Sequence, residues 1–199
     1  MVKIMKWRLY DMRKKLLAAL LAVSLTAGSV AAVPVPGSTE MVAEAAKKKT
    51  PSVKKIRQAI MKKFGDNYLA DLLLTKTEIK QRYGISSSWY SDIIAEIPMM
   101  SAHVDTLVIA KAKNKASKKK IKKKLTDYRA GLIKDTCQYP MNLLKIQASR
   151  VYEKDNYVFF IMLGQVDSKI QETATEEQII KAYKAENKKA VSVINSLFK

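Results

Sequence analysis

The feature that most constrains the fold is a change in the spacing of apolar residues along the chain. They recur at helical spacing in 53–64 and 175–198, whereas 91–112 and 145–163 hold alternating or continuous apolar runs. Paired runs of this kind are typical of antiparallel strands, and a helical stripe needs an apolar surface to pack on. The sequence therefore predicts an α+β fold: two N-terminal helices, then ββα-ββα, forming a four-stranded antiparallel sheet with helices packed on a face.

Several residues mark the ends of the expected helices. Thr75 with Glu78, and Thr175 with Gln178, have the spacing of a capping box, and Gly84 follows where the first of these two helices should stop. Ser117 is the expected N-cap of a third helix, whose apolar stripe includes Ile121. The alternating residues 145–153 are expected to form a strand.

The first 45 residues have the order of a secretory signal. A cationic start is followed by the apolar run 16–25 and then by small residues that offer cleavage after Ala45 or after Ala32. An uncleaved membrane anchor is the alternative, because the stretch from Leu16 to Val33 is nearly long enough to span a bilayer. The expected localisation is secreted, or extracytoplasmic at the cell envelope. The predicted organisation is a signal peptide (1–45), a basic linker (46–52) and a single α+β domain (53–199).

Charge is the strongest compositional signal. Lys and Arg number 37 and Asp and Glu 18, a net charge of +19, which favours anionic partners such as a cell-wall polymer or a membrane surface. A candidate binding surface lies on the third helix: Lys118, Lys119, Lys122 and Lys123. The same lysines could equally be the solvated face of an amphipathic helix. Nucleic acid is not expected as a partner, because arginine and interleaved aromatic residues are scarce in the basic segments. A protein partner remains possible.

Cys137 is the only cysteine, so no disulfide framework can hold the domain and the core must do so. The favoured interpretation of Cys137 is a small buried hydrophobe. The alternative is a cysteine nucleophile activated by His103, with Asp105 orienting the imidazole. No local sequence signature of a cysteine enzyme surrounds Cys137.

His103 is the only histidine, which argues against a zinc site, because zinc needs three or four protein ligands. His103 and Asp105 should share one strand face, with Glu96 approaching across the hairpin. A hydrogen bond between His103 and Asp105 is the expected role of this pair. No cofactor or metal is expected, and no glycine-rich phosphate loop occurs.

Three segments carry a family resemblance: 96–105 (EIPMMSAHVD), Tyr128-Arg129 leading to 138–142 (QYPMN), and 157–164 (YVFFIMLG). Together they resemble a bacterial exported family of domains of unknown function, the one numbered four-three-five-eight. Members are often lipid-anchored, whereas the leader of this chain has no cysteine. The resemblance implies export and brings no activity and no catalytic residues.

These observations favour an exported protein that acts as a non-catalytic binding or accessory module of the cell envelope, with a basic surface for anionic polymers or membrane. The alternative function is a cysteine-dependent enzyme that uses Cys137 and His103.

Overall fold

A computed structural model describes residues 50–135 and 137–199. The predicted signal peptide and the lysines of the predicted linker lie outside the described residues. The elements are, in chain order, α2 (Val53–Phe64), the 3-10 helix η1 (Gly65–Asn67), β1 (Leu72–Leu73), α3 (Lys76–Tyr83), β2 (Tyr90–Ile97), β3 (Thr106–Ala112), α4 (Lys115–Lys134), α5 (Pro140–Ala148), β4 (Arg150–Lys154), β5 (Tyr157–Met162), α6 (Ser168–Thr173) and α7 (Glu176–Leu197).

The strands form one antiparallel sheet in the order β1-β2-β3-β5-β4. This confirms the predicted α+β class, but the predicted number of four strands was wrong. The fifth strand, β1, contains only Leu72 and Leu73, which pair with Ile97 and Glu96 at the edge of the sheet. Two residues are too short to produce a periodic pattern, so the sequence held no signal for this strand.

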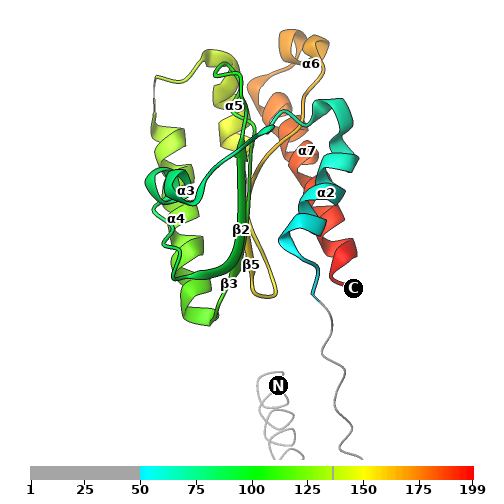
Figure 1. Cartoon of the computed structure of the whole chain (residues 1–199). Helices are drawn as coiled ribbons and strands as arrows, with labels where there is room; N and C mark the ends of the chain where they lie inside the picture. The colour runs from blue at the N-terminus through cyan, green and yellow to red at the C-terminus, as the bar shows by residue number, and fades with distance from the viewer. Residues whose placement is uncertain (1–49, 136) are drawn as a thin grey trace, which may run out of the picture. The chain divides into compact units, whose positions relative to one another are not determined.

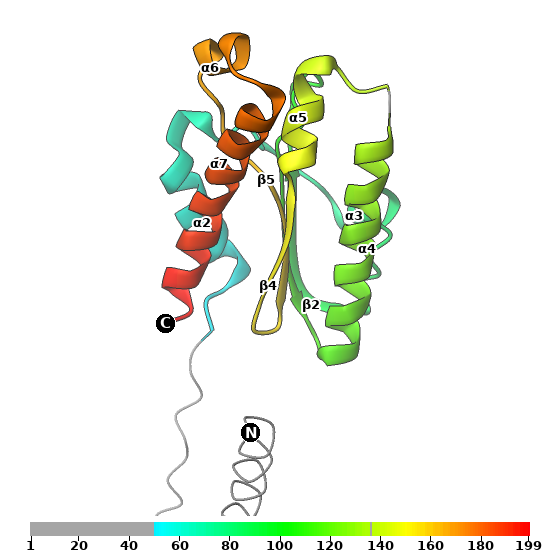
Figure 2. The same ribbon diagram turned by 180° about the vertical axis from the view of Figure 1, so that it is seen from behind.

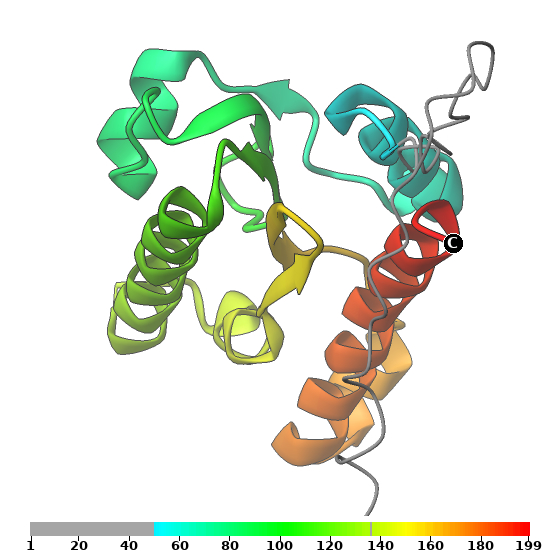
Figure 3. The ribbon, with the colours of Figure 1, turned by 90° about the horizontal axis from the view of Figure 1, so that it is seen from below.

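Helices cover both faces of the sheet, not one face as predicted (Figures 1 and 3). Side chains alternate along the central strands β3 and β5, so Ile109 and Phe159 pack towards α2 and α7. Val108 and Phe160 pack on the opposite face, towards α3 and α4. Strands with apolar side chains on both faces need helices packed on both faces. The continuous apolar runs in the sequence therefore already indicated two layers of helices.

The stretch expected to be a strand over 145–153 is divided between two elements. Residues up to Ala148 form α5, with Pro140 in its first turn, and β4 begins only at Arg150. Figure 2 shows α5 between α4 and α7, and Ala148 joins a small apolar cluster with Tyr183 of α7. The short alternation was misleading because tertiary packing, rather than local pattern, decides the state of so short a segment.

The capping predictions were right at two helices and wrong at a third. Capping boxes at Thr75 and Thr175 open α3 and α7. Helix α4, however, begins after Asn114, whose side chain accepts a hydrogen bond of 2.8 Å from the backbone N–H of Ser117. Ser117 is therefore the third residue of the helix and not its cap. In the part of the chain that the structure describes, no helix has the length and apolar character needed to cross a membrane.

Candidate functional site

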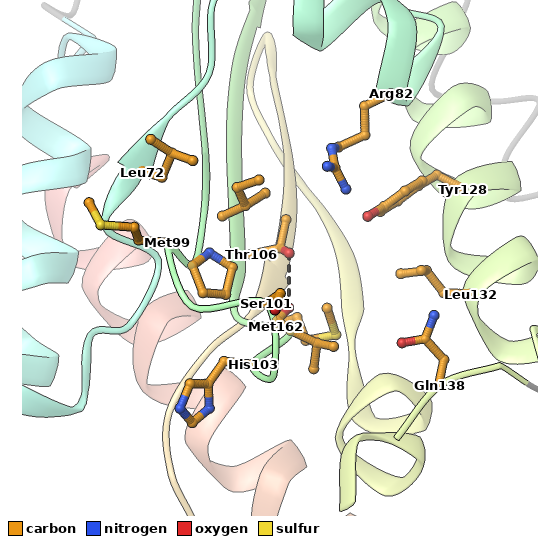
Figure 4. A pocket seen from close by; sticks show the side chains of 13 residues that line it. Leu72, Arg82, Met99, Ser101, His103, Thr106, Tyr128, Leu132, Gln138 and Met162 are labelled. Carbon is orange, nitrogen blue, oxygen red and sulfur yellow. Dashed lines mark hydrogen bonds between the residues drawn. The ribbon is translucent and has the colours of Figure 1, made fainter. Parts of the chain in front are cut away.

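A cavity of about 400 Å³ lies on the α3 and α4 face of the sheet, where β2 ends and β3 begins (Figure 4). A volume of this size is at the lower end of the range for small-molecule sites. Its apolar lining is Leu72, Ile97, Pro98, Met99, Val104, Leu132 and Met162. Its polar lining is Arg82, Ser101, His103, Thr106, Tyr128 and Gln138. The described residues that line the cavity include no carboxylate.

The cavity brings together segments that are distant in sequence. Residue 72 comes from β1, residue 82 from α3, residues 128 and 132 from α4, and residue 162 from β5. The loop between β2 and β3 supplies most of the remainder. All three segments on which the family resemblance rests therefore contribute to the lining of this one cavity.

Arg82 is placed at the cavity by the two ends of α3. The capping box at Thr75 fixes the start of the helix, and Gly84 ends it in the left-handed region, with φ 65°. A Cβ on Gly84 would lie 3.3 Å from the flexible side chain of Lys124, so the backbone conformation is the main reason for glycine here. Figure 4 shows the guanidinium of Arg82 directed into the cavity, close to the hydroxyl of Tyr128.

Tyr128 is held by two aromatic neighbours. Its ring makes edge contacts with Tyr83 at 4.8 Å and with Phe160 at 5.4 Å between centroids. Burial raises the pKa of Tyr128, and the nearby Arg82 opposes that rise. The phenol is therefore neutral near pH 7 and can donate a hydrogen bond into the cavity.

The wall formed by the β2–β3 loop is tied to α5. The side-chain amide of Asn142 donates to the carbonyl oxygen of Ala102 at 2.9 Å, and the Thr106 hydroxyl donates to the carbonyl oxygen of Val104 at 2.9 Å. On the opposite wall, the amide of Gln138 donates to Asp135 at 2.7 Å. These bonds position the lining without closing the cavity.

The predicted catalytic residues are not assembled as a triad. His103 is half-buried in the cavity wall, Asp105 is fully buried, and Cys137 is exposed. Among the described residues, no hydrogen bond joins the Cys137 thiol to the His103 imidazole, and Cys137 is not part of the cavity lining. The expectation that Cys137 is a buried hydrophobe was therefore wrong: it follows α4 in a connecting loop, where its backbone N–H donates to Asp135 at 2.9 Å.

Asp105 forms an ion pair with Lys145, and no hydrogen bond joins it to His103 among the described residues. The Lys145 ammonium donates to Asp105 Oδ2 at 2.6 Å, and the side chains are 5% and 0% exposed. Burial raises the pKa of Asp105, which Lys145 opposes, and burial lowers the pKa of Lys145, which Asp105 opposes. Asp105 Oδ1 has no hydrogen-bond partner among the described residues. The ion pair of Lys145 with Asp105 was not predicted from the sequence, because residue 145 was expected to lie in a strand.

Glu96 does not approach His103 either. It is fully buried on the α2 side of the sheet, where it accepts hydrogen bonds from Arg57 and, at 2.6 Å, from the Tyr68 hydroxyl. A buried carboxylate with these partners is a satisfied structural group. No cluster of three or more His, Cys, Asp or Glu side chains suited to a metal ion occurs within residues 50–135 and 137–199.

The four candidate lysines lie along the first half of α4 and differ in their surroundings. Lys118 and Lys122 both pair with Glu153 of β4, and Lys118 is only 23% exposed. Lys123 pairs with Asp127 on the same helix at 2.8 Å. Lys119 is exposed. Ile121 and Leu125 are fully buried and attach the helix to the sheet, as expected.

Sequence reasoning did not select Arg82, Tyr128, Leu132 or Gln138 as site residues. Tyr128 and Gln138 lie within the segments of the resemblance, which was the available signal. The sequence held no signal for Arg82, because basic residues are common in the last turn of a helix.

A family model matches residues 63–163, and its description is "Domain of unknown function (DUF4358)". The comparisons with curated proteins and with solved structures gave no match.

Proposed function

The chain belongs to the DUF4358 family, and from that premise we propose that it is an exported, non-catalytic binding module of the cell envelope. Two surfaces serve this role: the cavity, which takes a small ligand, and the lysine surface of α4 (Lys118, Lys119, Lys122 and Lys123), which attracts anionic polymer or membrane. The order of cationic, apolar and small residues before Lys47 supports export.

The single observation that supports a binding role is the composition of the cavity. Its lining combines an apolar surface with a few polar side chains that converge on it, which is the usual composition of a ligand site. A hydroxyl or thiol nucleophile is commonly activated by a base in hydrogen-bond contact with it. In the described chain, His103 has no such contact with Ser101 or Thr106, and the Thr106 hydroxyl is engaged by Val104. Binding without turnover is the function that this arrangement favours.

Filling the cavity tests its part of the proposal. Leu132→Trp places a larger side chain in the lining, whereas Ile133→Trp places it at the neighbouring position, which is 42% exposed and outside the lining. We expect Leu132→Trp to abolish binding of the apolar fluorescent probe anilinonaphthalene sulfonate, and Ile133→Trp to retain it. Circular dichroism checks that both variants fold, because overpacking costs about 1–3 kcal/mol. Equal probe binding by both variants would show that the cavity is not the site.

A charge-reversal pair tests the lysine surface. Lys119→Glu/Lys123→Glu changes two exposed side chains of α4, and Lys62→Glu/Lys63→Glu makes the same change of net charge on α2. We expect the α4 variant to lose sedimentation with phosphatidylglycerol vesicles and with isolated anionic cell-wall polymer, and the α2 variant to retain most of it. Wild-type binding should weaken as the Debye length shortens to about 8 Å at physiological salt. Equal losses in the two variants would indicate a general charge effect without a binding surface.

A further inference from the structure

The two sides of the cavity differ in polarity, although Leu132 lies on the side of Tyr128 and His103 on the side of Met99. Figure 4 shows Arg82, Tyr128 and Gln138 together on one side, from α3, α4 and the loop that follows α4. Leu72 and Met99 lie on the other side, and Met162 lies at the base. A ligand that satisfies both sides needs a polar group at one end and an apolar body at the other.

Arg82 gives the polar side a positive charge that no salt bridge within the described residues engages, although, after the hydrogen bonds from Thr75, this charge helps to lower the pKa of Glu78 one turn earlier. No ion pair joins its guanidinium to an acidic residue in the described part of the chain, and the cavity lining holds none. The nearest acid on its own helix is Glu78, one turn earlier. Glu78 Oε2, however, already accepts hydrogen bonds of 2.7 Å from both the backbone N–H and the hydroxyl of Thr75. The guanidinium is therefore available to an external anion.

Tyr128 complements this charge with a neutral hydrogen-bond donor. Its ring packs edge-on against Tyr83 and Phe160, and these contacts favour its position in the cavity wall. A guanidinium and a phenol side by side match two oxygen atoms of one carboxylate or phosphate.

The opposite side is aliphatic. Leu72 lies there beside Ile97, its partner in the sheet, and Met99 extends the apolar surface with a side chain that is 72% exposed. Methionine is unbranched and adapts to flexible apolar partners. This surface suits a saturated chain better than a polar sugar or nucleotide.

We propose that the cavity binds an anionic amphiphile, with the acid group on Arg82 and Tyr128 and an aliphatic chain along Leu72, Ile97 and Met99. This inference rests on the proposed binding function and names its ligand class. The acid could be the carboxylate of a free fatty acid or the phosphate of a membrane lipid, and both present the same chemistry to the site.

Matched ten-carbon probes separate the charge of the ligand from its apolar body. Decanoate and decyl phosphate carry an anion, decanol is neutral and decyltrimethylammonium is cationic. We expect isothermal titration calorimetry to show both anions binding at least about tenfold more tightly than decanol, because hydrogen bonds to charged groups are the strong ones. The cation should bind most weakly.

Arg82→Met removes the charge and keeps an apolar stem, and Arg150→Met removes one exposed charge on β4 as a matched control. Arg82→Met should weaken decanoate binding about tenfold to a hundredfold and leave decanol unchanged. Arg150→Met should change neither, and Tyr128→Phe should weaken decanoate only a few-fold.

Binding to phosphatidylglycerol vesicles distinguishes a membrane lipid from a free fatty acid as the ligand. If Arg82→Met also weakens binding to phosphatidylglycerol vesicles, the ligand class is a membrane lipid; if it weakens decanoate alone, the class is a free acid. Decanol binding as tightly as decanoate, or an Arg82→Met variant that binds decanoate like the wild type, would overturn the anion preference while leaving a binding cavity. Failure of all four probes to bind would remove the cavity function itself.

Discussion

Two buried acidic residues, Asp105 and Glu96, show how the fold accommodates charge in its interior. Asp105 pairs with Lys145 of α5, and Glu96 with Arg57 of α2 and the hydroxyl of Tyr68. In each case the partner comes from an element that is distant in sequence. A buried charge is costly unless it is paired and hydrogen-bonded, so these contacts hold α2 and α5 in place at the sheet.

Removing one partner of the Asp105–Lys145 pair should be more harmful than removing both. Lys145→Met leaves a buried carboxylate without its cation, and we expect a loss of about 3–5 kcal/mol of unfolding free energy at pH 7. The double variant Asp105→Asn/Lys145→Met should recover much of that loss. Urea denaturation of the three proteins measures both effects, and a double variant as unstable as Lys145→Met would contradict this account.

Asp105 also makes the free energy of unfolding depend on pH, and the direction of this dependence follows from its pKa. Burial raises the pKa of Asp105 above its usual 3.8. At pH values between the unfolded-state pKa and the higher folded-state pKa, the folded protein therefore holds a proton that the unfolded protein has lost. The contribution of Asp105 to the unfolding free energy therefore falls as pH rises from about 3.8. We expect the stability of the wild type relative to Asp105→Asn to decline over that interval. A rise would indicate that Lys145 outweighs burial.

Cys137 should behave as an exposed thiol. Because its side chain is open to solvent, a thiol reagent should label the native protein at a rate close to that measured in denaturant. Stopped-flow or mass-spectrometric labelling gives the two rates. Native labelling that is slower by orders of magnitude would mean that the thiol is covered in solution.

At the scale of elements, helix α4 has three structural roles, although its sequence looks like a single lysine-rich amphipathic helix. Ile121 and Leu125 bind it to the sheet, Tyr128 and Leu132 line the cavity, and its early lysines pair with Glu153 on the neighbouring strand β4. Some of the lysine charge is therefore used to join two elements, and the remainder faces solvent.

Glu153→Gln tests this connection between α4 and β4. The hydrogen bond from Lys122 lowers the pKa of Glu153 below its usual 4.5, so the stabilisation is present above that pH and is lost as pH falls through the folded-state pKa. We expect a loss of about 0.5–1 kcal/mol at pH 7, since the pair is partly solvated, and no difference in strong acid. Asp127→Asn, which breaks the more exposed pair with Lys123, should cost less in the same denaturation series.

At the scale of the whole molecule, one sheet lies between two layers of helices (Figures 1 and 2). Each face of the sheet has its own apolar cluster, and the cavity lies where β2 ends and β3 begins. The lysine surface lies nearer the other end of α4: Lys119 and Tyr128 are nine residues apart, which is about 14 Å along a helix. The two proposed binding surfaces are therefore separate, and variants of one should leave the other intact.

Both layers should contribute to stability. Phe159 faces α2 and α7, Phe160 faces α3 and α4, and both are fully buried. We expect Phe159→Ala and Phe160→Ala each to cost about 3–5 kcal/mol of unfolding free energy. Tyr139→Ala, at a position 57% exposed, should stay within about 0.5 kcal/mol. Chemical denaturation that shows a cost at only one phenylalanine would contradict a sheet covered on both faces.

The local features of this fold could be predicted from the sequence because short-range physics dictates them. The apolar spacing from Val53 to Phe64, the capping boxes at Thr75 and Thr175, and the continuous apolar run of β5 predicted helices and a central strand where the structure has them. Hydrophobic periodicity and helix capping act within a few residues, so one segment contains the whole signal.

The sequence by itself determined the α+β class, the interior strands and the family resemblance. Only the tertiary structure decided which residues meet: Lys145 with Asp105, Glu153 with Lys118, and Arg82 with Tyr128 at the cavity. It also decided that α5 is a helix and that β1 joins the edge of the sheet. The physical reason is that these outcomes depend on contacts across tens of residues, whose free energy appears only when distant segments pack together.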